Sequence, residues 1–263
     1  MHMLARKRVL TAINRLSFKK ILHVIKTRGP AVVHELTNFS LSEFKLVWKD
    51  LQFSVSQEWN VGSGRKCEVS GRDMLFMTLT SMKHCGSWDV VSVVFKEKSP
   101  MFSKRVNTFL AAIHPTLRAK DIDTVLDKYS IQHLHTSGHR FNNFPSALYA
   151  VDVTVQRTNA PAGSFNEKKC FYSKKHGQYG LKVEASVLPN GLAINVTTAV
   201  PGSVADIAIC ESNLDFHQDK LKKIGEEDDM LDDGPMQEKY PRSLALLADK
   251  SYQGLHRQLR SLR

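Results

Sequence analysis

The hydrophobic pattern of this chain changes its period partway along the 263 residues. Up to about residue 113, apolar side chains recur at helical spacing, whereas from Ala147 onward they run together or alternate as they do in β-strands. This order predicts a helical N-terminal region followed by an α/β domain. No stretch approaches the roughly 18 consecutive apolar residues that cross a bilayer, so we expect no membrane segment.

Capping and turn residues divide the first region into helices. Ser40 with Glu43 three residues later forms a capping-box signature, which predicts a helix through Leu51. Three further helices are predicted over residues 70–82, 88–95 and 99–113. The turn Gly86-Ser87 follows the first of these, and the arrangement up to the last helix, which carries Lys104 and Arg105, resembles a helix-turn-helix unit. A plain helical bundle with a solvated polar face explains the same pattern equally well.

The positive charge of the chain lies almost entirely in this first region. The net charge is +11, and residues 1–120 hold 20 Lys/Arg and 8 Asp/Glu, whereas residues 121–263 hold 17 and 18. Such an asymmetry favours a nucleic-acid partner, although solvated lysines on an ordinary basic protein remain the alternative. We therefore expect a basic DNA-binding region over residues 1–120. Its candidate DNA contacts are Arg72, Lys104 and Arg105.

The second region, residues 145–263, has the element order of an α/β domain. A buried strand is predicted over residues 147–156, and two strands over residues 181–188 and 192–200 are joined by the turn Pro189-Asn190-Gly191. Ser203 is expected to cap a helix to about Asn213, and the acidic run 226–233 is expected to be a solvated loop. A short buried strand, residues 244–248, follows.

Two aspartates stand in or beside these buried strands. Asp152 lies within the first strand, and Asp249 comes directly after the last one. An ionised carboxylate in such a place is costly unless it is paired or binds a cation. Two carboxylates brought together can hold Mg²⁺, a hard cation that prefers oxygen ligands and supports phosphoryl-transfer chemistry. A capping or salt-bridging role is the ordinary alternative for either residue.

Four sequence elements in order resemble those of PIF/Harbinger-like DDE transposases, which are DDE superfamily endonucleases. The first is the strand around Asp152, and the second is Tyr172-Ser173-Lys174-Lys175-His176 with the strand that follows. The third is Pro201-Gly202-Ser203-Val204-Ala205-Asp206, which is similar to the family's PGSxHD element. The fourth is Ala248-Asp249-Lys250-Ser251-Tyr252, which is similar to its ADKGY element.

The resemblance implies an RNase H-like mixed sheet and a metal-dependent nuclease and strand transferase that acts on DNA. It implies a two-metal site with Mg²⁺ or Mn²⁺, in which Asp152 is the first ligand. Asp249 is our preferred second ligand because it ends the strand expected beside Asp152. Asp206 is the competing candidate. Lys174 and Lys175 are candidate phosphate contacts, with an ordinary solvated basic turn as the alternative.

The chain also departs from the family pattern. Ala205 stands where the family usually has His, and Ser251 stands where it usually has Gly. Residues 250–263 contain no Asp or Glu, so the family's third acid is missing, along with the helix that carries it and a final strand. We therefore expect an incomplete sheet that leaves one face uncovered, as in a C-terminally truncated member, and impaired catalysis.

Three readings of function remain open at this point. In the first, the chain is a nuclease that uses Asp152 and Asp249. In the second, it is a transposon relic or domesticated protein that binds DNA without cutting it, so enzyme activity is uncertain. An unrelated α/β protein with a merely soluble basic half is the third. A separate DNA-binding accessory protein is a possible partner in the first two.

The sequence indicates a compartment only weakly. DNA as a substrate and the cluster Arg6-Lys7-Arg8 favour the nucleus, whereas the basic, acid-free N-terminal stretch also fits a mitochondrial presequence. Four cysteines lie far apart without a CxxC pair, which argues against a disulfide framework and fits a reducing compartment.

Overall fold

A computed structural model describes residues 19–84, 86–227 and 232–263. The chain divides into two compact units, Met1–Arg118 and Ala119–Arg263, and a separate hydrophobic core belongs to each. The cluster Arg6-Lys7-Arg8 lies outside the described residues. No described helix combines the length and the apolar character that a bilayer crossing requires.

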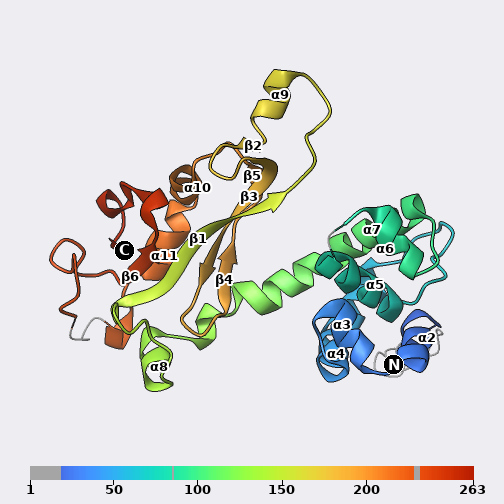
Figure 1. The fold of residues 1–263 in the computed structure, drawn as a ribbon. Coiled ribbons are helices and arrows are strands. Elements are labelled where there is room, and N and C mark those ends of the chain that lie inside the picture. Colours follow the sequence, from blue (N-terminus) through green and yellow to red (C-terminus); the bar gives the residue numbers. More distant parts are fainter. Residues whose placement is uncertain (1–18, 85, 228–231) are drawn as a thin grey trace. The chain divides into compact units, whose positions relative to one another are not determined.

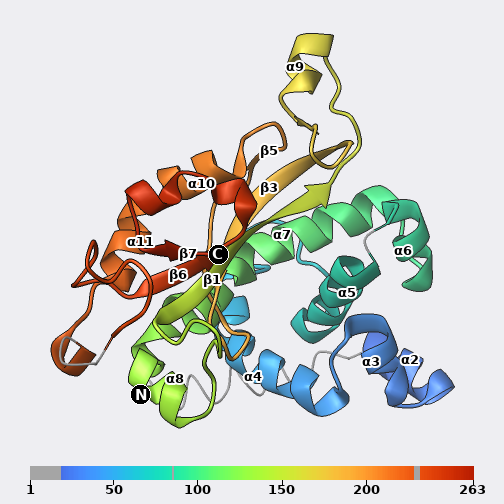
Figure 2. The ribbon, with the colours of Figure 1, turned by 60° about the vertical axis from the view of Figure 1, so that its left-hand side comes forward.

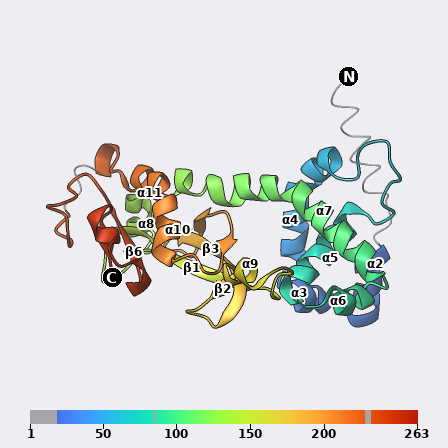
Figure 3. The ribbon, with the colours of Figure 1, turned by 90° about the horizontal axis from the view of Figure 1, so that it is seen from above.

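The first unit is helical, as the hydrophobic period predicts. Its described helices, which pack around one core (Figure 3), are α2 (Lys19–Arg28), α3 (Ala31–Thr37), α4 (Leu41–Glu58), α5 (Gly71–His84), α6 (Trp88–Val94) and α7 (Ser99–Arg118). The capping box at the start of α4 is confirmed, because Ser40 accepts from the backbone of Glu43 while the Glu43 carboxylate accepts from the backbone of Ser40. Helix α7 is longer than predicted and continues through Pro115.

The second unit is built around a mixed sheet with helices beside it (Figure 1). Its strands are β1 (Ala147–Arg157), β2 (Tyr172–Ser173), β3 (Gln178–Val187), β4 (Ala193–Val196), β5 (Val200–Pro201), β6 (Ala245–Ala248) and β7 (Ser261–Leu262). Its α-helices are α8 (Ile131–Thr136), α9 (Phe165–Lys169), α10 (Asp206–Ser212) and α11 (Leu214–Leu221). Short turns of helix complete it: η1 (Ala119–Asp123), η2 (Leu126–Lys128), η3 (Gly225–Glu227), η4 (Lys250–Tyr252) and η5 (Leu255–Arg257).

The strand order confirms the predicted α/β class with an RNase H-like mixed sheet. Strand β1 pairs antiparallel with β3, which pairs antiparallel with β4. On its other side β1 pairs in parallel with β6, and β6 pairs in parallel with β7. An antiparallel trio is thus followed by a helical connection and parallel strands, which is the arrangement that the element order predicted.

Helices α10 and α11 lie along one face of this sheet (Figure 2). The core beneath them combines inward side chains of β1 and β6 with the helices' own apolar residues; it includes Tyr149, Val151, Leu246, Ile209 and Leu221. Burial of such side chains stabilises the folded state by roughly 25 cal/mol for each Å² of apolar surface removed from water. The packing of these side chains therefore determines the position of α10 relative to β3.

Three local expectations about the second unit were wrong. The predicted third strand is interrupted and forms two short strands, β4 and β5, that both pair with β3. Helix α10 begins after Ala205 with no side-chain cap, so Ser203 does not cap it. A strand beyond β6 is present, because β7 pairs with β6.

The acidic run before β6 is also not wholly solvated. Asp232 forms ion pairs with Arg260 and Lys223, and its side chain is only 7% exposed. Burial would raise the pKa of Asp232, but hydrogen bonds from Arg260 and Lys223 together lower it to about 2. Arg260 is itself fully buried and also donates to the backbone oxygens of Gly234, Pro235 and Ser243. This cluster anchors the start of β7 to the loop before β6.

Candidate active site

Asp152 and Asp249 lie side by side at the point where β6 ends. Val151 of β1 pairs in parallel with Ala248 of β6, so the next residue of each strand is an aspartate on the same face. Asp249 keeps an extended backbone, with φ −79° and ψ −176°. Since neighbouring strands lie about 4.8 Å apart, two carboxylates in this register can reach one shared ion.

Both carboxylates are exposed and retain free acceptor capacity. Asp152 Oδ1 accepts a 2.8 Å hydrogen bond from the backbone of Val153. Asp249 Oδ1 accepts from the backbone of Ser251 at 2.8 Å and also from the Ser251 hydroxyl. In each aspartate these hydrogen bonds engage only Oδ1, which leaves Oδ2 for a ligand.

Asp206, the competing second acid, is held differently. Its Oδ1 lies 2.9 Å from Lys182 Nζ and its Oδ2 lies 2.9 Å from Lys175 Nζ. The Asp206 and Lys182 side chains are 4% and 5% exposed. Burial would raise the pKa of Asp206, but the hydrogen bonds from Lys182 and Lys175 lower it below its usual range. Both oxygens of Asp206 are thus engaged by ammonium groups.

Lys175 connects this buried pair to the two exposed aspartates. Its hydrogen bond to Asp206 raises the pKa of Lys175, and the charges of Asp206, Asp249 and Asp152 raise it further. The Lys175 side chain is 52% exposed. A cation shared among three acids in this way lowers the repulsion between Asp152 and Asp249, and it can exchange partners because it remains accessible to solvent.

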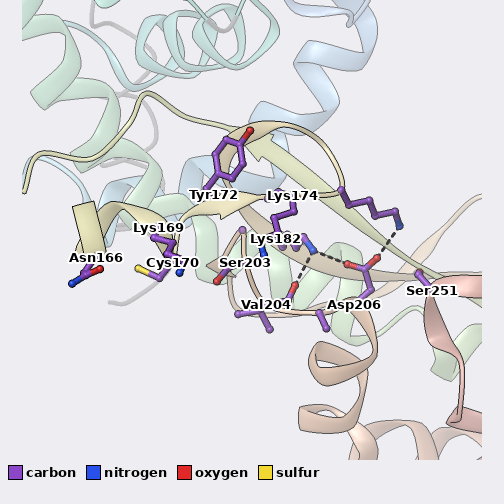
Figure 4. A pocket seen from close by; sticks show the side chains of 14 residues that line it. Asn166, Lys169, Cys170, Tyr172, Lys174, Lys182, Ser203, Val204, Asp206 and Ser251 are labelled. Carbon is purple, nitrogen blue, oxygen red and sulfur yellow. Dashed lines mark hydrogen bonds and ion pairs between the residues drawn. The ribbon is translucent and has the colours of Figure 1, made fainter. Parts of the chain in front are cut away.

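A basic pocket of about 680 Å³ opens beside these groups (Figure 4). Four lysines line it, together with backbone and small polar residues; the lysines are Lys169, Lys174, Lys175 and Lys182. Lys182 and Asp206 face each other at one side of the pocket, and Ser251, which donates to Asp249, borders it. The pocket therefore offers positive charge near the candidate carboxylates Asp152 and Asp249, which Lys175 and Ser251 connect to its wall.

The structure places the candidate DNA contacts of the helical unit in three different settings. Lys104 is exposed on α7. Arg105, one residue on, is paired with Glu97 and is 23% exposed. Arg72 is half-buried, with its guanidinium carbon 5.6 Å from the centre of the Trp48 ring. Of these three, Lys104 presents its charge most openly.

Sequence reasoning missed the polar side chains on the inner face of β3. Lys182, Glu184 and Ser186 alternate along β3 with half-buried apolar residues, and all three are buried. Glu184 lies beside Cys210 of α10 and His217 of α11. Burial raises the pKa of the Cys210 thiol, and the Glu184 charge raises it further. Alternation in the strand was visible in the sequence, but nothing in it showed that the polar side faces inward.

The residues present fit a divalent metal at Asp152 and Asp249. Mg²⁺ and Mn²⁺ prefer carboxylate oxygens and retain several water ligands, which suits two exposed carboxylates at a strand end. Each of the two has a free oxygen, and neither is neutralised by a direct ion pair among the described residues. The donor set matches a hard, oxygen-preferring ion.

Comparison with family models gives a match over the part of the chain that contains these aspartates. Comparison with curated proteins and with solved structures gives no match. Residues 151–261, which include Asp152, Asp206 and Asp249, match the model of the family described as DDE superfamily endonuclease. This part of the α/β unit is therefore similar to DDE superfamily endonucleases.

Proposed function

We propose that the α/β unit cleaves DNA phosphodiester bonds with divalent metal held by Asp152 and Asp249. The observation that carries the proposal is the parallel pairing of Val151 with Ala248, which sets the two carboxylates side by side. Bound Mg²⁺ or Mn²⁺ supplies Lewis-acid stabilisation of the charge that develops during phosphodiester hydrolysis. We assign Asp249 rather than Asp206 as the second ligand because Asp206 is saturated by two lysines.

The lysines of the pocket bind and orient the DNA backbone in this proposal. Lys169 and Lys174 are exposed and line the pocket, so they can neutralise phosphates that approach the two aspartates. Asp206 is a positioning residue that holds Lys175 at the edge of the acidic pair. Lys175 in turn orients an incoming phosphate toward Asp152 and Asp249, since it is half exposed and lies among all three acids.

The second candidate function is DNA binding without cleavage. It is favoured because the described residues bring together two carboxylates with a free oxygen, Asp152 and Asp249, whereas the family resemblance implies three acids. Two carboxylates neutralise less metal charge than three, so we propose that cleavage is impaired relative to a complete three-acid site. On either reading the exposed lysines of the pocket contact DNA.

The helical unit is proposed as a further DNA-binding region. Helices α5, α6 and α7 follow one another as the helix-turn-helix interpretation requires, and α7 presents Lys104 to solvent. A helical bundle without DNA contacts is the competing interpretation. Action on chromosomal DNA implies a nuclear location, with mitochondria as the alternative, and a separate DNA-binding protein is a proposed accessory partner.

Nicking of supercoiled plasmid by the purified chain tests the proposal. We expect Mg²⁺- or Mn²⁺-dependent nicking that disappears in Asp152→Asn and persists in Asp215→Asn, whose carboxylate is exposed on α11. Absence of nicking in the wild-type chain, with salt-sensitive DNA binding retained, would establish the non-catalytic function instead. Metal-independent nicking that survives in Asp152→Asn would indicate a contaminating nuclease.

A further inference from the structure

A second group of metal-ligating side chains lies on the opposite face of the sheet from Asp152. It consists of Glu184 on β3, Cys210 on α10 and His217 on α11, and all three are buried. One ligand atom from each lies within 4.8 Å of the others. Because Asp152 pairs with Ala185, the residue next to Glu184, the two groups are on opposite sides of β3 and cannot be one site.

The surroundings of His217 are those of a metal-binding histidine. Its Nδ1 lies 2.9 Å from the Tyr149 hydroxyl, and its Nε2 lies 3.1 Å from Glu184 Oε1. A ligating histidine commonly donates its second ring nitrogen to an oxygen acceptor, which fixes the ring and leaves the first nitrogen for the ion. Tyr149 fills that outer role here, and Asn213 Nδ2 donates to the same Glu184 oxygen, Oε1, at 3.3 Å.

Two buried oxygens at this cluster have no partner among the described residues. Glu184 Oε2 and the Tyr252 hydroxyl are both withdrawn from solvent and form no hydrogen bond there. Tyr252 lies close enough to Glu184 and Cys210 for their charges to act on its hydroxyl. Buried polar atoms without partners are rare, because each costs about 1–3 kcal/mol. The unpartnered Glu184 oxygen, beside the ligand atoms of Cys210 and His217, indicates that a further group belongs in this cluster.

We propose that Glu184, Cys210 and His217 bind one Zn²⁺ ion. A set of one carboxylate, one thiol and one imidazole suits this borderline-soft ion, whereas Mg²⁺ and Ca²⁺ select oxygen ligands alone. The Cys210 thiol gives up its proton to solvent as its sulfur binds the ion. A water or another neighbouring polar group would complete the coordination of the ion.

Such an ion would tie the helices to the sheet. Cys210 stands four residues after Asp206 on α10, so the two side chains share one face of that helix. Fixing Cys210 against Glu184 therefore also fixes Asp206 against Lys182, two residues earlier on β3. The inference does not depend on nuclease activity, since it concerns how α10 is held.

Cobalt substitution of the purified chain tests the proposal directly. We expect one equivalent of Co²⁺ to produce a thiolate-to-cobalt charge-transfer absorption, and Zn²⁺ to displace the Co²⁺ and abolish this absorption. The signal should disappear in Cys210→Ser and remain in Cys170→Ser and Cys67→Ser, which remove thiols outside the cluster. The absorption should also remain in Asp152→Asn, because this variant changes the proposed nuclease site and leaves the Glu184–Cys210–His217 cluster intact. A wild-type chain without the absorption, or one whose absorption survives in Cys210→Ser, overturns the proposal.

A measurement on the unmutated chain covers the case in which Cys210→Ser does not fold. We expect the Tm to rise with increasing Zn²⁺ and to fall when the metal is chelated, because the ion binds only the folded cluster. In Asp152→Asn, which removes the proposed nuclease metal site, Zn²⁺ should still raise the Tm, whereas Mg²⁺ at the same concentrations should leave it unchanged because a thiol-containing site does not select Mg²⁺. A Tm that is insensitive to Zn²⁺ and to chelation shows that water or a shifted hydrogen bond fills the cluster.

Discussion

The carboxylate of Asp206 lies 2.9 Å from the ammonium group of Lys182, and both side chains are almost completely buried. This pair joins the first turn of α10 to the inner face of β3. Because the other oxygen of Asp206 is engaged by Lys175, Asp206 is committed to two cations and not to a metal. These contacts support our proposal that Asp206 positions lysines and that Asp249 is the second metal ligand beside Asp152.

Removing the ammonium group of Lys182 should destabilise the α/β unit. In Lys182→Met the buried Asp206 charge keeps only Lys175, which is half exposed. Loss of one partner from a buried pair costs about 3 kcal/mol in the free energy of unfolding. Urea denaturation measures the change, and Lys220→Met, which removes a surface pair with Asp219, should stay within about 0.5 kcal/mol of wild type. Equal effects of the two substitutions would contradict the structural role of the buried pair.

Acid should weaken the cluster that anchors β7. The folded-state pKa of Asp232 is about 2, whereas the pKa of an unperturbed aspartate is about 3.9. A depressed folded pKa stabilises the protein above the unfolded value, and this stabilisation is lost as the pH falls from about 4 to about 2. We expect a loss of about 2 kcal/mol from this group over that window, measured by urea unfolding at each pH. In Asp232→Asn the stability should fall less steeply over the same range, and an unchanged slope would count against the assignment.

The exposed lysines of the pocket should contribute to DNA binding through charge alone. Lys174→Gln should weaken binding similarly for all sequences and reduce the slope of log K against log salt by about 1. Fluorescence anisotropy with a labelled duplex at several salt concentrations measures this slope. Lys128→Gln, an exposed lysine outside the pocket in the same unit, is the matched control and should leave the slope unchanged. The same small change in both variants would mean that the pocket is not the DNA path.

Loss of the α4 capping box should cost a defined amount of stability in the helical unit. Ser40→Ala removes the side-chain oxygen that accepts from the backbone of Glu43. We expect the free energy of unfolding to fall by about 1 kcal/mol, which is the usual cost at an N-cap position. Ser42→Ala, two residues further along the chain, is the comparison because it keeps the Ser40 oxygen that accepts from Glu43. Chemical denaturation followed by circular dichroism measures the free energy of unfolding of both variants.

Much of the fold could be predicted because local pattern and tertiary structure agree. The α4 capping box, the long strand around Asp152 and the short strand before Asp249 follow from spacing and hydrophobic period, and the parallel pairing of those strands follows from the family resemblance. Asp152 and Asp249 could be paired in advance because strand order determines which residues lie side by side.

The inner side of β3 could not be predicted in the same way. Alternation from Leu181 to Val187 predicts apolar residues inside, yet Lys182, Glu184 and Ser186 face inward. Lys182 and Glu184 are tolerated there because α10, α11 and Asn213 between them bring polar partners against these two side chains; the partners are Asp206, Asn213 and His217. The partners come from residues 20 to 35 positions away, and no local pattern records such distant pairing. The buried Arg260–Asp232 pair escaped prediction for the same reason.

The dependence of plasmid nicking on Mn²⁺ concentration, compared between Asp249→Asn and Asp206→Asn, tests the central assignment most directly. If Asp249 is a metal ligand, its variant should lose nicking or require far more Mn²⁺, as Asp152→Asn should. Asp206→Asn should keep the wild-type Mn²⁺ requirement, although it binds DNA less well because Lys175 is no longer held. The reverse result, with Asp206→Asn losing the metal response and Asp249→Asn retaining it, would contradict the account.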